Sequence, residues 1–403
     1  MAKIDDYIPI VGESVVGDLR LVASRLRGKR ILNVNSTAVG GGVAEILNRM
    51  VPLLRELGLD VRWDVIKGGE EFFEVTKKFH NALHGGRVDI GEKDFEIFME
   101  TSRKNLEEMD TSGDIVFIHD PQPIVLVQKR TNNKWIWRCH IDLSDPKQKV
   151  WRFLKEFVVQ YDAAVFSAPA FSRKLPIRQF LIAPSIDPLS DKNRELPQEV
   201  IDGILNKYGI PKDKPIITQI SRFDRLKDPL GVIATYRLVK KHIDCRLLLA
   251  GGTATDDPEG QKVFEEVMES ANGDPDIHIL SMSQNDLEIN ALQRASTVII
   301  QKSLKEGFGL TVSEALWKSK PVVASNVGGI PLQIKHKHSG LLCYSAEGAA
   351  FAVKQFLSSP EYARKIGENG REHVRNNFLI TRHLRDYMLL FLSLYHKENI
   401  VYL

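Results

Sequence analysis

Residues 297–317, TVIIQKSLKEGFGLTVSEALW, contain the pattern that decides the fold. The β-branched run at 297–303 predicts a buried strand, and the following segment opens a predicted helix that includes Ala315, Leu316 and Trp317. Gly307 and Gly309 lie between them and let the backbone approach a ligand closely. Because the free N–H groups at a helix start suit an anion, this junction predicts a binding site.

Two carboxylates frame these glycines. Glu306 precedes the predicted helix, and Glu314 lies about one turn inside it. One carboxylate can reach a sugar hydroxyl while the other reaches a ribose diol further along. The alternative is a capped helix with Glu306 as a solvated loop acid. Two acids around two glycines at a strand–helix junction favour the binding site.

The same alternation of strand and helix extends in both directions along the chain. Such alternation implies parallel sheets with helices on both faces. The predicted strands are residues 30–35, 61–66, 114–119, 135–141, 163–167, 180–184, 215–221, 245–251, 276–280, 297–303 and 321–325.

A change of composition divides the alternation into two halves. The segment PSIDPLSDKNRELPQE, residues 184–199, is rich in Pro, Ser, Asp and charge, as linkers often are. We therefore predict an α/β protein with two doubly wound domains, residues 1–190 and 191–380. A last helix at about 381–403 is expected to pack back on the first domain. Ligands of such sheets bind outside the carboxyl ends of the strands, so the two domains should face a cleft lined by strand-end loops.

Bulk composition excludes several classes of function. The 403 residues suit two or three domains, and 43% hydrophobic residues can bury a sizeable core. With 55 Lys and Arg against 52 Asp and Glu, the net charge of +3 gives no reason to expect nucleic acid or an anionic membrane as partner. No segment is long and apolar enough for a membrane span, and the N-terminus lacks the order of a secretory signal.

The three cysteines are far apart in the sequence. Cys139, Cys245 and Cys343 have neither the spacing of a metal site nor that of a disulfide framework. We therefore expect a reducing cytoplasm.

A second motif is SRFDRLKD, residues 221–228, directly after a predicted strand. Arg222 offers a planar fork and Lys227 a point charge, and two such cations at a helix start suit a diphosphate. Asp228 is a predicted cap for a helix that Pro229 begins. An ordinary solvated basic loop is the alternative.

Other polar residues also follow predicted strands. Gly40–Gly42 come after the first strand without the dinucleotide fingerprint, so they predict either a phosphate approach or a flexible turn. His140 and Asp142 stand at the end of another strand, where a histidine can donate to a sugar hydroxyl or act as acid or base. A histidine satisfied within the strand edge is the alternative. The same two interpretations apply to Asp120 and Gln122, in HDPQP, which follow another predicted strand.

Other chemistries find no support. The chain has no Gly-x-Ser-x-Gly elbow and no Walker loop. Asp256 and Asp257 read as a solvated helix cap, so no metal site is predicted.

These motifs together resemble a known family. The segment from Glu306 to Glu314 resembles the glutamate–seven residues–glutamate motif of retaining glycosyltransferases of family 4, and residues 221–227 resemble their diphosphate-binding loop. In the first half, VNSTAVGGGVAEIL, VTKKFHNALHG, HDPQP, WRCHIDLS and PSIDPLS are similar to the glycosyltransferring trehalose synthases of archaea and bacteria. Retaining trehalose phosphorylases share a related pattern. The resemblance covers residues from about 31 to 378.

The resemblance implies a fold and a reaction. The fold is that of two Rossmann-like domains facing a cleft, known as GT-B. In the reaction, glucose from a nucleoside diphosphate glucose (ADP- or UDP-glucose) is joined to glucose, giving α,α-trehalose reversibly and with retention. The nucleotide sugar is a co-substrate, and no cofactor is tightly bound. Stimulation by magnesium is compatible with this, because the nucleotide itself binds it. A homodimer is left open.

The resemblance also implies site residues, in three groups. Those implied in catalysis are Glu306, Arg222, Lys227 and His140. Those implied in donor binding are Gly41, Gly42, Phe308, Gly309, Leu310, Thr311 and Glu314. Those implied in acceptor binding are His80, Asn81, Asp120, Gln122, Arg138 and Asp142.

Four alternatives stay open. A trehalose phosphorylase would use phosphate, but the ribose-binding acid Glu314 favours a transferase. Glucose 6-phosphate as acceptor would need a basic pocket, for which Lys77, Lys78 and Arg87 are candidates. The third is an epimerase on the same double fold, and the fourth is a sugar-binding protein without activity. For retention, a double displacement would need Glu306 against the anomeric carbon. The resemblance instead favours front-face attack, with a phosphate oxygen taking the acceptor proton.

Overall fold

The computed structural model describes residues 2–39, 41–252, 258–282 and 285–396, and the chain divides into two compact units. Unit 1 consists of Met1–Ser185 and Ile380–Leu403, and unit 2 of Ile186–Leu379. The sequence analysis placed these boundaries at residues 190 and 381. The α/β class with two doubly wound parallel sheets is confirmed.

Unit 1 is built on a six-stranded parallel sheet in the order β2-β1-β3-β4-β5-β6. Its central strand β3 is buried along its whole length, which is why its sequence is continuously apolar. The strands are β1 Arg30–Asn35, β2 Asp60–Val65, β3 Ile115–His119, β4 Lys134–Cys139, β5 Ala163–Phe166 and β6 Arg178–Leu181.

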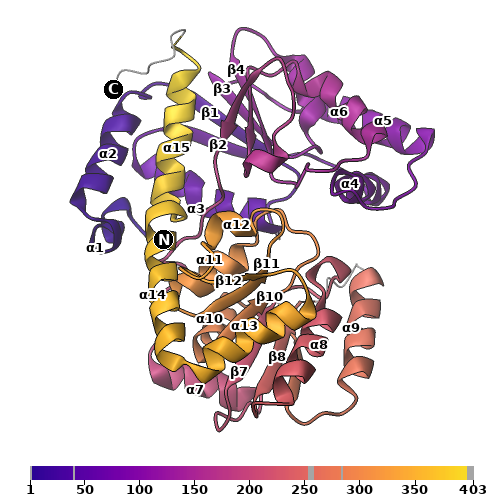
Figure 1. Ribbon diagram of the computed structural model, residues 1–403. Helices are drawn as coiled ribbons and strands as arrows, with labels where there is room; N and C mark the ends of the chain where they lie inside the picture. The colour runs from indigo at the N-terminus through magenta and orange to yellow at the C-terminus, as the bar shows by residue number, and fades with distance from the viewer. Residues whose placement is uncertain (1, 40, 253–257, 283–284, 397–403) are drawn as a thin grey trace. The chain divides into compact units, whose positions relative to one another are not determined.

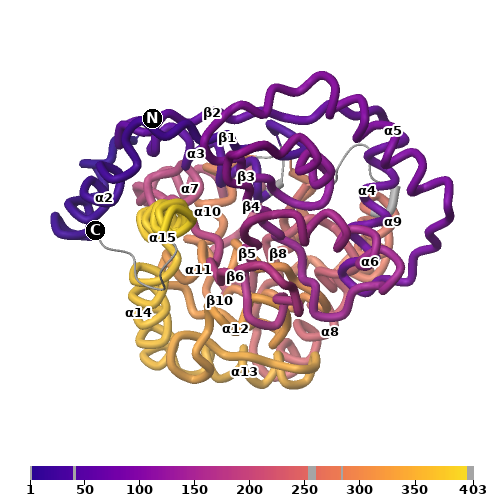
Figure 2. Tube along the Cα trace, turned by 90° about the horizontal axis from the view of Figure 1, so that it is seen from above, coloured from indigo at the N-terminus to yellow at the C-terminus, as the bar shows by residue number. Residues whose placement is uncertain are grey.

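Helices cover both faces of this sheet. Helices α4, α5 and α6 pack together on one side of the strands, while α2 and α15 pack on each other on the opposite side (Figures 1 and 2). The helices of unit 1 are η1 Ile4–Tyr7, α1 Ile8–Val11, α2 Glu13–Ser24, α3 Gly41–Glu56, α4 Glu70–Leu83, α5 Glu92–Glu108, η2 Ile124–Lys129, α6 Gln148–Val158, η3 Pro169–Phe171 and α15 Ile380–Ser393.

The last helix, α15, is anchored in unit 1 by polar and aromatic contacts. His383 Nδ1 lies 2.8 Å from Ser185 Oγ. The rings of Tyr387 and Phe391 pack edge-on against Phe117 of β3, with centroids 4.9 and 5.6 Å away. These contacts place the helix that the sequence analysis expected at about 381–403 against the first sheet.

Unit 2 is built on a second six-stranded parallel sheet, in the order β12-β11-β10-β7-β8-β9. This is the strand order of the Rossmann fold, with β7 as its first strand. The strands are β7 Ile216–Ile220, β8 Arg246–Gly251, β9 Ile277–Ser281, β10 Val298–Gln301, β11 Val322–Ser325 and β12 Leu341–Cys343.

The helices of unit 2 also form two layers. Helices α8, α9 and α13 pack together over one apolar face of the sheet, and α7 and α10 over the other. The helices are α7 Gln198–Lys207, η4 Arg225–Lys227, α8 Pro229–Lys240, α9 Pro258–Ala271, α10 Asp286–Ala295, α11 Leu310–Trp317, α12 Ile330–Gln333, α13 Ala346–Ser358 and α14 Pro360–Asn377.

Each strand predicted from the sequence is present, and the sequence analysis missed β12. With three residues, Leu341–Cys343, β12 is too short to show a period of its own and forms by pairing with β11. Within the part of the chain that the structure describes, no helix has both the length and the apolar character that crossing a bilayer requires.

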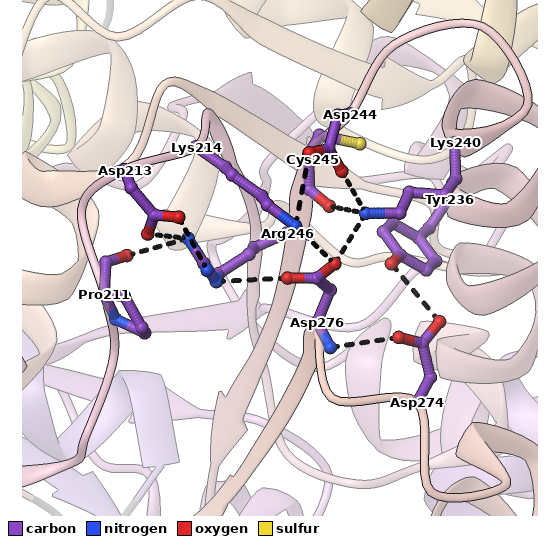
Figure 3. A network of polar contacts seen from close by, with 10 residues as sticks. All are labelled: Pro211, Asp213, Lys214, Tyr236, Lys240, Asp244, Cys245, Arg246, Asp274 and Asp276. Carbon is purple, nitrogen blue, oxygen red and sulfur yellow. Dashed lines mark hydrogen bonds and ion pairs between the residues drawn. The ribbon is translucent and has the colours of Figure 1, made fainter.

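A network of charges closes the amino-terminal edge of the second sheet (Figure 3). Asp276, just before β9, accepts from Lys214 Nζ at 2.9 Å and Lys240 Nζ at 2.6 Å, and Arg246 Nε lies 3.3 Å away. The hydrogen bonds from the two lysines hold the pKa of Asp276 at about 2. Because ligands bind at the opposite edge of such sheets, we assign this network to stability.

We expect Asp276→Asn to lower the free energy of unfolding by about 1–3 kcal/mol, because it leaves three cations around a neutral amide. The difference from the wild type should be constant above about pH 5 and should shrink as the pH falls from about 4 toward 2, since the folded-state pKa is depressed. Urea denaturation across this pH range measures it. Glu368→Gln, which removes an exposed i,i+4 pair with Arg364, is the control and should change stability by less than about 0.5 kcal/mol. Equal effects of the two substitutions would contradict the assignment.

Candidate active site

The strand order of unit 2 reverses between β7 and β10, which brings two loops together. The loops that follow these strands, residues 221–228 and 302–309, both leave the carboxyl edge at this switch point. Lys227 Nζ lies 2.7 Å from Glu306 Oε2. Their side chains are 20% and 9% exposed, so this ion pair is largely shielded from water. The two sharpest motifs of the sequence therefore meet in one contact.

Further hydrogen bonds hold this ion pair in place. Ser303 Oγ donates to Glu306 Oε2 at 3.1 Å, and Gln219 Nε2 of β7 donates to the Lys227 carbonyl at 2.8 Å. The backbone N–H of Leu304 donates to the carbonyl of Leu226 at 2.8 Å, which joins the two loops directly. Sequence reasoning missed Ser303, although it ends the strand segment that the analysis began from.

A second ion pair supports the Lys227 loop from behind. Asp228 caps α8, as predicted, by accepting from Gly231 N at 3.0 Å. Its other carboxylate oxygen pairs with Lys302 Nζ. Asp228 has a left-handed backbone, φ 49°, which turns the chain between η4 and α8. Lys302 was not predicted, because only the packing of β10 beside β7 places it near Asp228.

Glycines allow the chain to fold closely around Glu306. Gly309 is the N-cap of α11 at φ 82°, and a Cβ there would lie 3.1 Å from Glu306 Cγ. Gly328 has φ 55°, and a Cβ there would lie 1.6 Å from the Glu306 carbonyl oxygen. A side chain at residue 328 is therefore incompatible with the present course of the Glu306 loop.

The predicted donor-binding residues Phe308, Gly309, Leu310 and Thr311 lie around the start of α11. Leu310 and Thr311 form the first turn of this helix. The ring of Phe308 is buried, and its carbonyl accepts from Gln333 Nε2 at 2.5 Å. The same Gln333 accepts from Ser313 Oγ at 2.5 Å, so an amide that sequence reasoning missed holds both ends of this turn.

Glu314 is buried in α11 and is held from several sides. Its carboxylate accepts from Gln293 Nε2 at 3.4 Å and lies 3.9 Å from Lys192 Nζ. Lys318, one turn later, donates to the Glu314 carbonyl at 3.2 Å and to Asn193 Oδ1 at 3.0 Å. Burial lowers the pKa of Lys318 to about 7. Neither lysine was predicted, although Lys318 stands four residues after Glu314.

Arg222, the second predicted diphosphate ligand, is exposed. Its side chain is 64% accessible, and its Nη2 lies 3.7 Å from Asp224 Oδ2. Arg222 is thus on the same loop as Lys227 but is held less firmly.

In unit 1 the strand order reverses between β1 and β3, and predicted residues again follow the strands. Asp120, directly after β3, has φ 65° and accepts from the backbone N–H of His140 at 2.7 Å. Trp137 Nε1 donates to the Asp120 carbonyl at 3.0 Å. Burial raises the pKa of Asp120 to about 6. Asp120 thereby connects the loop after β3 with the loop after β4.

His140 is half-buried and has a histidine partner that was not predicted. Its Nε2 lies 3.2 Å from Nδ1 of His119, and His119 Nε2 lies 3.2 Å from Asn33 Oδ1. Burial, assisted by the Arg138 guanidinium, lowers the pKa of His119 to about 3 and that of His140 well below its usual range. His119 adjoins Asp120 in the HDPQP segment, which is the signal that could have identified it.

The remaining acceptor candidates lie in different surroundings. Arg138 is buried within β4 and donates to Ser167 Oγ at 3.1 Å. Asp142 is buried and accepts from the backbone N–H of Ser144 at 2.8 Å. Gln122 follows Asp120 and is half-buried.

His80 and Asn81 lie in the last turn of α4. The His80 ring packs edge-on against His84 at 4.6 Å, and the Asn81 carbonyl accepts from Gly86 N at 2.8 Å. Lys78, in the same helix, is paired with Asp94 at 2.8 Å. Arg87 is exposed.

The glycine segment after β1 differs from the sequence interpretation. Gly40–Gly42 were interpreted as a phosphate approach or a flexible turn, but α3 already begins at Gly41, and Gly42 is its second residue. Gly40 lies outside the described residues. The loop is therefore shorter than expected, because the apolar spacing that marks the helix starts only at Val43 and cannot reveal its first turn.

No group of three or more His, Cys, Asp or Glu side chains within the described ranges is arranged to hold a metal ion. Asp256 and Asp257, interpreted from sequence as a cap, lie outside these ranges.

Comparison with solved structures identifies the fold class. The chain resembles an α,α-trehalose-phosphate synthase (UDP-forming) from Burkholderia vietnamiensis with a TM-score of 0.73 and 15% identity, over 91% of this chain and 98% of the other. It resembles a sucrose-phosphate synthase from Thermosynechococcus elongatus with a TM-score of 0.71 and 18% identity, over 91% and 99%. Two doubly wound parallel units of this kind define the GT-B fold of glycosyltransferases.

Sequence comparison identifies the family. Residues 33–173 match the family described as "Trehalose synthase, N-terminal domain", and residues 200–373 match "Glycosyl transferases group 1". The chain is 46% identical to a trehalose synthase of Rubrobacter xylanophilus over 96% of both chains. It is 44% identical to a trehalose synthase of Pyrococcus horikoshii over 97% of this chain and 96% of the other. The chain therefore belongs to the trehalose synthase family and is a hexosyltransferase.

We expect Gly328→Ala to disrupt the Glu306 loop, because its methyl group would overlap the Glu306 carbonyl. Gly209→Ala is a matched control, since Gly209 is also left-handed in unit 2, at φ 63°, but has nothing within 4 Å of the added Cβ. The control should cost about 1–2 kcal/mol of backbone strain and leave turnover unchanged. Gly328→Ala should cost more stability and also lower turnover at least ~10-fold. Thermal unfolding and steady-state kinetics measure both, and equal behaviour of the two variants would contradict the close packing described.

Proposed function

We propose that this enzyme transfers glucose from a nucleoside diphosphate glucose, ADP- or UDP-glucose, to glucose and so forms α,α-trehalose reversibly with retention of configuration. The observation that carries the proposal is the ion pair between Lys227 and Glu306 at the switch point of unit 2. Identities of 46% and 44% to proteins named trehalose synthase support the product.

The residues around this ion pair suit the departure of a diphosphate. Cleavage of the glycosidic bond builds negative charge on the leaving group, and fixed cations there stabilise the transition state selectively. We assign this role to Lys227 and Arg222, assisted by the free N–H groups at the start of α11. Lys227 is positioned before any substrate binds, because Glu306 and the Gln219 amide fix both ends of the residue. The chemistry then needs no metal ion from the protein, and magnesium would act only through the nucleotide.

Glu306 and Glu314 have separate roles in this proposal. The Glu306 carboxylate accepts from Lys227 and Ser303 through the same oxygen, Oε2, which supports Oε1 as the atom that meets the donor sugar hydroxyls. Glu314 would bind the ribose diol. Its carboxylate is held by Gln293 and Lys192, which restricts its movement.

A neutral acceptor fits unit 1 better than a sugar phosphate. Of the three cations considered for a phosphate pocket, Lys78 is already paired with Asp94, and Lys77 and Arg87 are exposed rather than gathered in a preformed pocket. This supports glucose over glucose 6-phosphate. A trehalose phosphorylase of Pleurotus pulmonarius is 28% identical, and this chain spans 58% of its length. Glu314 is a buried acid that would bind a ribose diol. Its presence supports a nucleotide donor over inorganic phosphate.

The first experiment tests the reaction itself. The purified enzyme is incubated with ADP-glucose or UDP-glucose and either glucose or glucose 6-phosphate, with and without EDTA, and the products are separated by chromatography. We expect trehalose and nucleoside diphosphate with glucose as acceptor, and residual activity in EDTA. Trehalose 6-phosphate as the main product would replace the acceptor assignment. Cleavage of trehalose that depends on phosphate and not on nucleoside diphosphate would overturn the proposal, and complete reversible loss in EDTA would overturn its metal-free form.

The second experiment tests the ion pair. Glu306→Gln should lower kcat about 10- to 100-fold, because charge-assisted hydrogen bonds to a shielded carboxylate contribute on the order of 1.5–3 kcal/mol. Lys227→Ala should cost several kcal/mol of transition-state stabilisation, or more than about 100-fold in kcat/KM. Asp276→Asn, which also removes a charge paired with lysines but at the other edge of the sheet, is the control and should stay within about twofold. Near-wild-type turnover of either site variant would remove the ion pair from the mechanism.

A further inference from the structure

A line of three polar side chains crosses the carboxyl edge of the first sheet. Asn33 belongs to β1, His119 ends β3, and His140 follows β4, so they come from three neighbouring strands. Asn33 Oδ1 lies 3.2 Å from His119 Nε2, and His119 Nδ1 lies 3.2 Å from His140 Nε2. Asn33 is 1% and His119 2% exposed, so neither can exchange its partner for water without opening the sheet edge.

With Asn33 Oδ1 toward His119, the order of donors and acceptors along this line follows from the chemistry of the groups. An amide oxygen only accepts, so His119 Nε2 carries the proton that bonds to Asn33. A neutral imidazole has one N–H, and His119 Nδ1 must therefore accept. His140 Nε2 then donates to it. The second nitrogen of His140, Nδ1, is left with its lone pair.

The imidazole rings of His119 and His140 are both neutral in these surroundings. Burial lowers the pKa of His119 and of His140, and the Arg138 guanidinium lowers both further. The ring of His383 acts on His140 in the same direction. Asp120 is adjacent to His119 in the sequence. Its carboxylate accepts a hydrogen bond from the backbone N–H of His140 rather than from the His140 ring.

The packing also fixes the direction of the rings. The rings of His119 and His140 are 5.6 Å apart and nearly parallel, at 22°. The His119 ring is itself held against Phe117 at 4.5 Å. The Asp120 carboxylate fixes the backbone of His140 while His119 fixes its side chain, so a shift of either would move His140 Nδ1.

We propose that Asn33 and His119 are positioning residues that hold His140 as its Nε2–H tautomer, so that His140 Nδ1 accepts a hydrogen bond from a hydroxyl group of the sugar substrate. This refines the sequence interpretation, in which the histidine could be either donor or acid–base. The inference rests on the proposed function for the identity of the ligand as a sugar. The tautomer itself follows from unit 1 alone.

The opposite orientation of the Asn33 amide is the competing arrangement. It would place the amide nitrogen against His119, reverse each donor along the line and leave His140 Nδ1 protonated. In the present orientation Asn33 Nδ2 is buried and has no hydrogen-bond partner among the described residues. The two arrangements predict opposite protonation of His140, at Nε2 in the present orientation and at Nδ1 in the other.

The primary test needs no substrate. Long-range 1H–15N NMR of the full-length enzyme labelled with 15N-histidine distinguishes the two ring tautomers, and the signals that disappear in His140→Gln assign residue 140. We expect His140 to be protonated at Nε2 in the wild type. Protonation at Nδ1 would overturn the proposal, whether or not the enzyme makes trehalose. If His140 has the expected tautomer but the enzyme makes no trehalose, only the proposed substrate is refuted.

Variants then connect the tautomer to catalysis. Asn33→Leu should mix the tautomers and lower kcat about 10-fold. Asn105→Leu removes another buried amide of unit 1, one that bonds to Lys67 and Thr101 within the α5 region, and is the matched control. It should lose stability but keep the His140 tautomer and turnover. Equal kinetic losses in Asn33→Leu and Asn105→Leu would overturn the proposal.

Discussion

The contact between Lys227 and Glu306 is the interaction on which the candidate site of unit 2 depends. It joins the loop after β7 to the loop after β10 at the switch point, together with the backbone hydrogen bond from Leu304 to Leu226 and the ion pair between Asp228 and Lys302. The left-handed turns at Asp228 and Gly328 and the ion pair between Asp228 and Lys302 all serve to place its two ends. A cation and an acid are thereby held in contact at this edge of the sheet.

In unit 1, hydrogen bonds between neutral side chains, rather than an ion pair, position the groups at the switch point. Its switch point places Asn33, His119 and His140 in a hydrogen-bonded line, and Asp120 holds the backbone of the last of them. The opposite edge of the second sheet instead carries the charge network around Asp276, where no motif pointed to a ligand. Parallel sheets separate the two tasks in this way, because the carboxyl ends of all strands meet at one edge and the amino ends at the other.

Much of the fold could be predicted because buried parallel strands have continuous apolar sequences. The strand β1 was predicted at its observed bounds, Arg30–Asn35, and a helix including Ala315–Trp317 was predicted within α11. The prediction failed where a signal was too short or came from elsewhere in the chain. The three-residue β12 exists through its pairing with β11, and the first turn of α3 contains Gly41 and Gly42, which look like a loop.

The sequence by itself determined the two doubly wound units, the family, and the residue types available at each strand end, because these follow from local periodicity and from short motifs. Only the tertiary structure decided the partners. Lys227 and Glu306 are 79 residues apart, and Asn33 and His119 are 86 apart. Neither segment contains a sequence signal that identifies its partner, because a hydrogen bond between them depends on which strands become neighbours. The order of strands in each sheet, and with it the pairing of these side chains, is a property of the whole folded unit.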